Sequence, residues 1–130
     1  MDPSLSFVNV LVVDNDATIR ELLTEALEAY GATVLAVETA PAALSALQAH
    51  RPDVLVSDLE MPGKDGYWLI AQVRALPMDQ GGMTPAACLT GLFEPEVRAD
   101  LLRAGFQYHI AKPVSIDTLI GIVSILALKP

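Results

Sequence analysis

The stretch VNVLVVDND, residues 8–16, decides the fold. Its first six residues form a nearly continuous apolar run rich in β-branched side chains, and the run ends at Asp14. Such a run is typical of a strand buried in a parallel sheet. From Asp16 to Tyr30 the apolar residues recur at helical spacing, and Gly31 follows as a helix stop. This part of the chain therefore predicts a strand followed by a helix.

The same alternation of strand and helix continues to the end of the chain. We expect further strands over residues 33–37, 53–57, 85–90 and 108–111, and further helices over 41–50, 66–76, 94–104 and 115–128. Strict alternation predicts a parallel sheet covered by helices on both faces, with right-handed crossovers. In such sheets the functional crevice lies beyond the carboxyl ends of the strands, so the residues that end each strand are the candidates for a site.

Composition and charge restrict the class of protein. The chain has 130 residues, of which 52 % are hydrophobic and few are aromatic, so we expect one domain with an aliphatic core. The formal net charge of −8 argues against nucleic acid or an anionic membrane as a partner. The single cysteine, Cys88, excludes an internal disulfide. Residues 1–4 lack the basic start of a secretory signal, and no apolar stretch is long enough for membrane insertion, so a cytoplasmic protein is expected.

Four of the five expected strands end in polar or charged residues. These residues are Asp14, Asn15 and Asp16 after the first strand, Asp58 after the third, Thr90 and Gly91 at the fourth, and Lys112 after the fifth. Ionised carboxylates that crowd together need a shared cation, and a small set of oxygen ligands suits Mg²⁺. A carboxylate beside Mg²⁺ can attack a phosphoryl group and form an aspartyl-phosphate. Thr90 and Lys112 are suited to bind the phosphoryl oxygens.

Each of these residues also has a purely structural explanation. Asp16 stands where a helix N-cap is expected, and we favour the cap over a metal ligand. Thr90 alone would be a strand-end hydroxyl bonded to the backbone, and Lys112-Pro113 is a common loop dipeptide. The prediction of a site therefore depends on the combination of residues on consecutive strands.

With these residues identified, the sequence resembles the receiver domain of two-component response regulators over about residues 8–126. The matching segments are the acidic turn at 14–16, DLEMPGKDG at 58–66, LTG at 89–91 and AKP at 111–113. Residues 106–114 are also similar to receivers of hybrid sensor kinases. The resemblance implies a flavodoxin-like (βα)5 three-layer sandwich with strand order 2-1-3-4-5. It also implies one receiver domain over 1–130, with its core at about 8–128 and no effector domain.

The resemblance further implies a function. Asp58 would accept a phosphoryl group from a histidine kinase or phosphotransfer protein, and Thr90 and Lys112 would respond to its presence. Asp14, Asp58 and the backbone carbonyl of Glu60 would help to hold Mg²⁺. Such a domain is a phosphoacceptor that can catalyse its own phosphorylation and dephosphorylation, and it is not a stand-alone enzyme.

The sequence departs from the family pattern at three positions. Asn15 replaces the second of two adjacent acids; its amide oxygen can still bind Mg²⁺, but we expect weaker binding. His109 occupies the aromatic switch position, where it is either a switch residue or a surface imidazole, and Tyr108 should face the opposite side of the strand. Gly91 replaces the usual alanine and leaves room at the phosphoryl site, which predicts faster hydrolysis of the aspartyl-phosphate.

The last expected helix is apolar around much of its circumference. Leu119, Ile120, Val123 and Leu126 are predicted to face the sheet, whereas Ile122, Ile125 and Leu128 remain for the outward face. Between Asp117 and Lys129 the sequence has no charged residue. An ordinary surface helix is polar on its outer face, so we expect this one to contact a second copy or a neighbouring domain. The alternative is a wider groove against the helix at 16–30.

Other functions fit parts of the pattern. The turn at 14–16 also resembles the first motif of haloacid-dehalogenase-type phosphatases, with Asp14 as the nucleophile, but that interpretation leaves the loop at Asp58 unexplained and lacks an acidic pair after Lys112. A pseudo-receiver that docks proteins without phosphorylation is made possible by Asn15. A flavin site is disfavoured because the acidic turn would repel the flavin phosphate.

Overall fold

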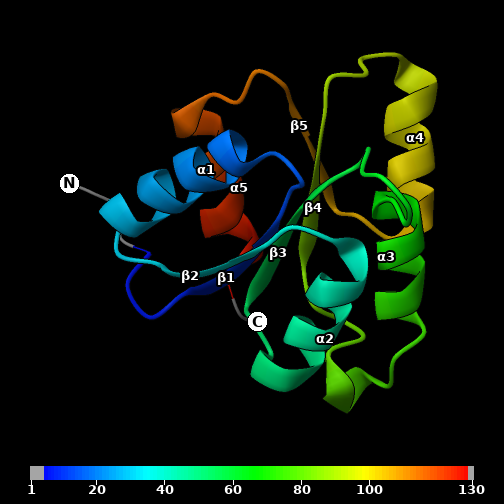
Figure 1. The fold of residues 1–130 in the computed structure, drawn as a ribbon, viewed down its shortest axis with the longest axis horizontal. Helices are drawn as coiled ribbons and strands as arrows, with labels where there is room; N and C mark the ends of the chain where they lie inside the picture. Colours follow the sequence, from blue (N-terminus) through cyan, green and yellow to red (C-terminus); the bar gives the residue numbers. More distant parts are fainter. Residues whose placement is uncertain (1–4, 129–130) are drawn as a thin grey trace.

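The computed structural model describes residues 5–128, so residues 1–4, where a secretory signal was judged absent, and Lys129 lie outside the described part. Strands and helices alternate along the chain (Figure 1). The strands are β1 (Asn9–Val13), β2 (Thr33–Val37), β3 (Val54–Asp58), β4 (Ala86–Thr90) and β5 (Tyr108–Ala111). The helices are α1 (Ala17–Ala29), α2 (Ala40–His50), α3 (Gly66–Arg74), α4 (Pro95–Ala104) and α5 (Ile116–Leu126), with a short 3-10 helix, η1 (Met78–Gln80), before β4.

The five strands form one parallel sheet in the order β2-β1-β3-β4-β5, which confirms the predicted fold class. Figure 1 shows α1 and α5 on one side of this sheet and α2, α3 and α4 on the other. Because all strands run in the same direction, their carboxyl ends meet at one edge. That edge carries the residues that the sequence marked as candidates.

Two apolar cores lie on the two faces of the sheet. The core under α1 and α5 is built from aliphatic side chains such as Val12, Leu23 and Leu119. The core under α2, α3 and α4 is also mainly aliphatic, with Phe106 and the thiol of Cys88 among its members. Burial, together with the charge of Asp58, raises the pKa of Cys88, so this thiol stays protonated and inert at neutral pH. The predicted aliphatic core is confirmed.

Helix α5 buries the four residues predicted to face the sheet, and Ser115 caps its first turn through the backbone N–H of Thr118. Ile122 was predicted to face outward, but it packs partly against the core under α1 and α5, so that prediction was wrong for Ile122. Ile125 remains 50 % exposed, and Leu128, which lies beyond the last helical residue, is 76 % exposed. The outward apolar surface is therefore smaller than the sequence suggested.

Arg74 joins three segments at the amino ends of β4 and β5. Its guanidinium donates hydrogen bonds to the carbonyl oxygens of Gly82 (2.9 Å) and Thr84 (2.8 Å), before β4, and of Gly105 (3.1 and 2.8 Å), after α4. Burial lowers the pKa of Arg74 from its ordinary value. Gly105 leaves space for this side chain, because a Cβ there would lie 2.9 Å from Cγ of Arg74. No sequence pattern indicated this network.

Within residues 5–128, no helix has the length and apolar character needed to cross a membrane.

Candidate functional site

Four predicted site residues meet at the carboxyl edge of the sheet. Asp14 follows β1, Asp58 and Thr90 end β3 and β4, and Lys112 follows β5. Asp14, Asp58 and Thr90 are buried, whereas Lys112 is half-buried. The structure therefore brings together side chains that are separated by up to 98 positions in the sequence, 112 minus 14.

Lys112 lies between the two buried carboxylates. Its ammonium donates a hydrogen bond to Oδ1 of Asp58 at 2.9 Å, and its Nζ is 3.5 Å from Oδ2 of Asp14. The backbone N–H of Lys112 also donates to the carbonyl oxygen of Thr90 at 3.0 Å, which fixes the start of this segment against β4. One cation thus partly neutralises two anions that would otherwise repel each other.

The pKa values of Asp14 and Lys112 reflect this arrangement. Burial raises the pKa of Asp14, and the charge of Asp58 raises it further, while the Asp16 N–H and Lys112 offset only part of the shift. Burial alone would lower the pKa of Lys112, but the hydrogen bond and charge of Asp58, together with Asp14, outweigh it and raise that pKa. At neutral pH Lys112 is therefore charged, and the ionised form of Asp14 is held at a cost in free energy.

The turn after β1 positions Asp14. Its Oδ1 accepts a hydrogen bond from the backbone N–H of Asp16 at 2.9 Å, and its carbonyl oxygen accepts one from Arg20 at 2.7 Å. The side chain of Asp16 accepts from the N–H groups of Thr18 and Ile19, so it caps α1. This confirms the preference for a cap. Arg20 belongs to the segment that resembles the receiver family, but its hydrogen bond to the carbonyl oxygen of Asp14 was not predicted.

The loop after Asp58 is tightly packed at its far end. A Cβ on Gly66 would lie 2.7 Å from the carbonyl oxygen of Asp58, so only glycine fits there without displacement of the strand end. Asp65 caps α3 by accepting from the N–H of Trp68 at 2.9 Å, and the ammonium of Lys64 lies 5.6 Å from the centre of the Trp68 ring. Gly66 is a positioning residue, and the sequence marked it twice: it ends the matching segment at 58–66 and it starts an expected helix.

Thr90 is partly engaged by the backbone. Its Oγ1 accepts a hydrogen bond from the N–H of Leu92 at 3.1 Å, as the structural explanation of this residue required. No residue within 5–128 accepts a hydrogen bond from this hydroxyl, so its proton is available as a donor. A Cβ on Gly91 would have no atom within 4 Å, so this position opens into free space.

The two neighbouring aromatic residues of β5 face opposite sides of the sheet, as predicted. Tyr108 packs against the core under α1 and α5. His109 is paired in register with Cys88 of β4, whose side chain belongs to the other core. Nε2 of His109 is buried and has no hydrogen-bond partner among the described residues. The imidazole is thus half-buried rather than fully exposed, and its role as a switch residue stays a prediction.

The donors at this edge fit a small hard cation. Oδ2 of Asp14 is buried without a hydrogen-bond partner among the described residues, and Asp58 supplies a second carboxylate close to the same ammonium. Asn15 and Glu60 follow the same two strands and are exposed. Residues 5–128 contain no cluster of three or more His, Cys, Asp or Glu side chains able to hold a metal. A site with two carboxylates must therefore draw its other ligands from backbone, amide or water oxygens, which suits Mg²⁺.

Comparisons with known proteins agree with this geometry. A family model described as the response regulator receiver domain matches residues 10–124. An uncharacterized 14.6 kDa protein of Leptolyngbya boryana is 42 % identical over 120 residues, which are 92 % of this chain and 90 % of that protein. The DNA-binding transcriptional regulator NtrC of Escherichia coli K12 is 33 % identical over 114 residues, or 88 % of this chain, and the chain spans only 24 % of that regulator.

Three further similarities concern one sensor kinase and two solved structures. The sensor histidine kinase GacS of Pseudomonas protegens is 33 % identical over 115 residues, which are 88 % of this chain and 12 % of the kinase. The chemotaxis protein CheY4 of Vibrio cholerae superposes with a TM-score of 0.86 at 28 % identity, covering 93 % of this chain and 99 % of CheY4. The receiver domain of a histidine kinase from Syntrophus aciditrophicus gives 0.82 at 31 %, covering 92 % and 89 %.

Proposed function

The chain belongs to the response regulator receiver domain family, and on that premise we propose that it is a phosphoacceptor in which Asp58 receives the phosphoryl group. The observation that carries the proposal is the position of Lys112, whose ammonium contacts both Asp58 and Asp14 at the carboxyl edge of the sheet. A buried carboxylate with a lysine cation and a second carboxylate beside it can form an acyl-phosphate as a covalent intermediate.

The chemistry assigns a task to each residue. No described residue forms a hydrogen bond with Oδ2 of Asp58, whereas Oδ1 is held by Lys112, so Oδ2 is the oxygen that attacks phosphorus. A new O–P bond forms while the bond from phosphorus to the donor's leaving group breaks, and the leaving group departs with the electron pair. The Lys112 ammonium then pairs with one phosphoryl oxygen, and the Thr90 hydroxyl donates to another.

Asp14, Asp58 and the backbone carbonyl of Glu60, with the amide oxygen of Asn15 nearby, would hold Mg²⁺, which supplies charge neutralisation at the phosphoryl oxygens. The buried Oδ2 of Asp14, which lacks a hydrogen-bond partner among residues 5–128, supports this assignment. With an amide in place of the second acid, the site carries one negative charge fewer, and we expect weaker Mg²⁺ binding than a site with two adjacent acids has.

The proposed phosphodonor is a histidine kinase or a phosphotransfer protein, and the proposed location is the cytoplasm. These assignments follow from family membership and from the sensor kinase among the relatives. We also propose that the chain forms a single receiver domain, and that Ile125 and Leu128 contribute to a contact with a second copy or a neighbouring domain.

Intact mass after incubation with a small phosphodonor, with and without Mg²⁺, tests the proposal. We expect addition of one phosphoryl group that requires Mg²⁺ and is abolished in Asp58→Asn. The Asp100→Asn variant, which alters an exposed carboxylate on α4, is the matched control and should be phosphorylated normally. Covalent phosphate on Asp14 would favour the phosphatase mechanism instead, and failure of all donors to react would favour the pseudo-receiver.

A further inference from the structure

Strand β2 forms one open edge of the sheet. It lies at the end of the strand order and pairs only with β1 among the described strands. Its sequence, TVLAV, contains no charged residue and no proline, the residues that usually protect an edge strand from further pairing. Thr33, Leu35 and Ala36 are exposed. The edge is therefore able to accept another extended chain.

The backbone of β2 presents free hydrogen-bonding groups along this edge. The N–H of Thr33 donates to the carbonyl oxygen of Val8, and the carbonyl oxygen of Val37 accepts from the N–H of Asp14, so these two residues bond toward β1. Residues of a strand alternate in direction. The N–H and C=O groups of Val34 and Ala36 therefore point away from β1, toward the open side.

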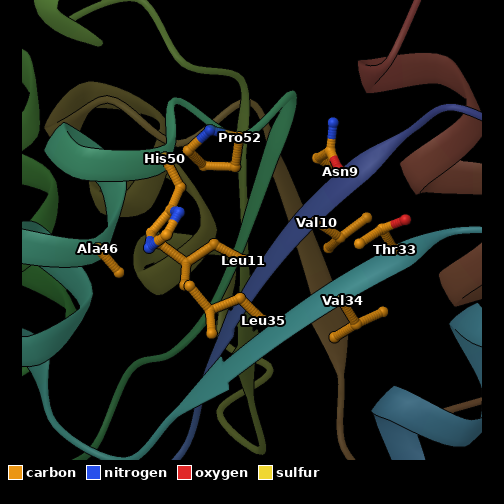
Figure 2. Close-up of a pocket in the computed structure, with 9 residues that line it drawn as sticks. All are labelled: Asn9, Val10, Leu11, Thr33, Val34, Leu35, Ala46, His50 and Pro52. Atoms are coloured by element: carbon orange, nitrogen blue, oxygen red, sulfur yellow. The ribbon is translucent and has the colours of Figure 1, made fainter.

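An apolar groove of about 350 Å³ lies on one side of this edge (Figure 2). Figure 2 shows Leu11 and Leu35 from the strands facing Ala46 and His50 of α2, with Pro52 at one end. Leu35 is 39 % exposed in this groove. A strand added beside β2 would direct every second side chain to this face of the sheet, where an apolar side chain fits.

An acidic hollow of about 340 Å³ lies on the other side, between α1 and the end of β2. It is lined by Ala36 together with Glu21 and Glu25 of α1. Arg20 also lines it, but its guanidinium is already bonded to the carbonyl oxygen of Asp14. The intervening side chains of an added strand would enter this hollow, where the two carboxylates favour lysine or arginine.

We propose that the β2 edge binds an extended segment of another protein in which apolar and basic residues alternate. Backbone hydrogen bonds to Val34 and Ala36 would add the segment to the sheet as a sixth strand. Its apolar side chains would occupy the groove beside Leu35, and its basic side chains would face Glu21 and Glu25. The site is separate from Asp58, and the proposal does not depend on phosphorylation.

Charge favours this occupant over a second copy of the chain. In an antiparallel pairing of β2 with its own copy, both α1 helices lie on the same face of the joined sheet. Glu21 and Glu25 of one copy would then approach the same residues of the other, and each chain carries a formal net charge of −8. A basic segment removes this repulsion and uses the same backbone groups.

The test titrates the isotope-labelled chain with a short blocked peptide of alternating lysine and valine, and follows the amide signals by NMR. We expect the largest shifts, and new protection from hydrogen exchange, at Val34 and Ala36, at peptide concentrations up to about 1 mM. A peptide with the same residues in block order, all lysines followed by all valines, is the matched probe. It should bind at least fivefold more weakly, because it loses the period of two.

Two variants separate the backbone and charge contributions. Ala36→Pro removes an outward N–H that β1 does not use, and it should abolish binding. The double variant Glu21→Gln/Glu25→Gln keeps the fold and should weaken binding about fivefold. Glu28→Gln is the control: Glu28 is on α1 but lines neither the apolar groove nor the acidic hollow, so its replacement should change binding less than twofold.

Absence of binding, equal affinity for the block-ordered peptide, or shifts confined to other elements would overturn the proposal. So would concentration-dependent shifts at Val34 and Ala36 without peptide, because they would identify a second copy of the chain as the occupant.

Discussion

Replacement of Arg74 by methionine is expected to lower the free energy of unfolding by about 3 kcal/mol. Methionine keeps an unbranched apolar stem of similar length and removes every donor. Five hydrogen bonds disappear: two to the carbonyl oxygen of Gly105, one each to those of Gly82 and Thr84, and one to the side-chain oxygen of Gln107. The two loops that carry these carbonyl groups, before β4 and after α4, then lose their common partner.

The magnitude follows from two opposing contributions. A hydrogen bond to a charged group contributes roughly 1.5–3 kcal/mol, so five bonds would give about 7–15 kcal/mol if they were independent. They share one side chain, the freed carbonyls of the loops regain water, and removal of the buried guanidinium relieves the cost of its burial, which the lowered pKa of Arg74 reflects. The balance leaves about 3 kcal/mol, or a decrease in Tm of about 10 °C for a domain of this size.

The assay is urea unfolding followed by circular dichroism, with Arg103→Met as the control. The side chain of Arg103 is 71 % exposed and pairs with Asp100 one turn earlier on α4, so its loss should cost less than about 0.5 kcal/mol. If Arg74→Met unfolds within 1 kcal/mol of the wild type, the carbonyl network does not hold the three segments together and the reasoning is wrong.

Three further predictions concern the site. Asp14→Asn should raise the free energy of unfolding at neutral pH, because burial raises the pKa of Asp14 and makes its ionised form costly in the folded state. This gain in stability should be present above the raised pKa and should disappear below the ordinary value of 3.8. Urea unfolding at a series of pH values from 7 to 3 would measure it. Gly66→Ala should lower the free energy of unfolding by about 2 kcal/mol and slow phosphorylation, because the new Cβ meets the carbonyl oxygen of Asp58. Gly121→Ala on α5, where a Cβ would have no atom within 4 Å, should instead raise the free energy of unfolding by about 0.5–1 kcal/mol. Thermal unfolding compares the two variants. Asn15→Asp should bind Mg²⁺ more tightly, and equal affinities by metal titration would contradict that view of Asn15.

The alternation of strands and helices was predictable because buried parallel strands are continuous apolar runs. The end of β3 was predicted to within one residue. The strand was expected to end at residue 57, and in the structure Asp58 is its last residue. The meeting of Asp14, Asp58 and Lys112 was predictable too, because strand ends in a parallel sheet share one edge.

Features that depend on contacts between distant loops were not predictable. The carbonyl groups that Arg74 binds belong to residues without a distinctive side chain, so nothing in the sequence marks them as partners. Ile122 illustrates a second limit: helical spacing gives the direction of a side chain but not the width of the groove that receives it. The outward N–H and C=O groups of Val34 and Ala36 illustrate a third limit, because within residues 5–128 they are unpaired only as a result of the place of β2 at the edge of the sheet.

The arginine network also constrains α4 at one end only. Arg74 holds Gly105, directly after the last residue of α4, while the first turn of α4 begins at Glu94, close to Thr90 and free of any side-chain cap. The carboxyl end of α4 is thus held by Arg74, whereas its amino end has no side-chain cap among the described residues. Because the Thr90 hydroxyl accepts a hydrogen bond from Leu92, just before α4, we expect a displacement of that hydroxyl to act on α4 at its uncapped end while Gly105 stays fixed. The exposed residues Leu92 and Phe93, in the loop before the first turn, would then be displaced furthest.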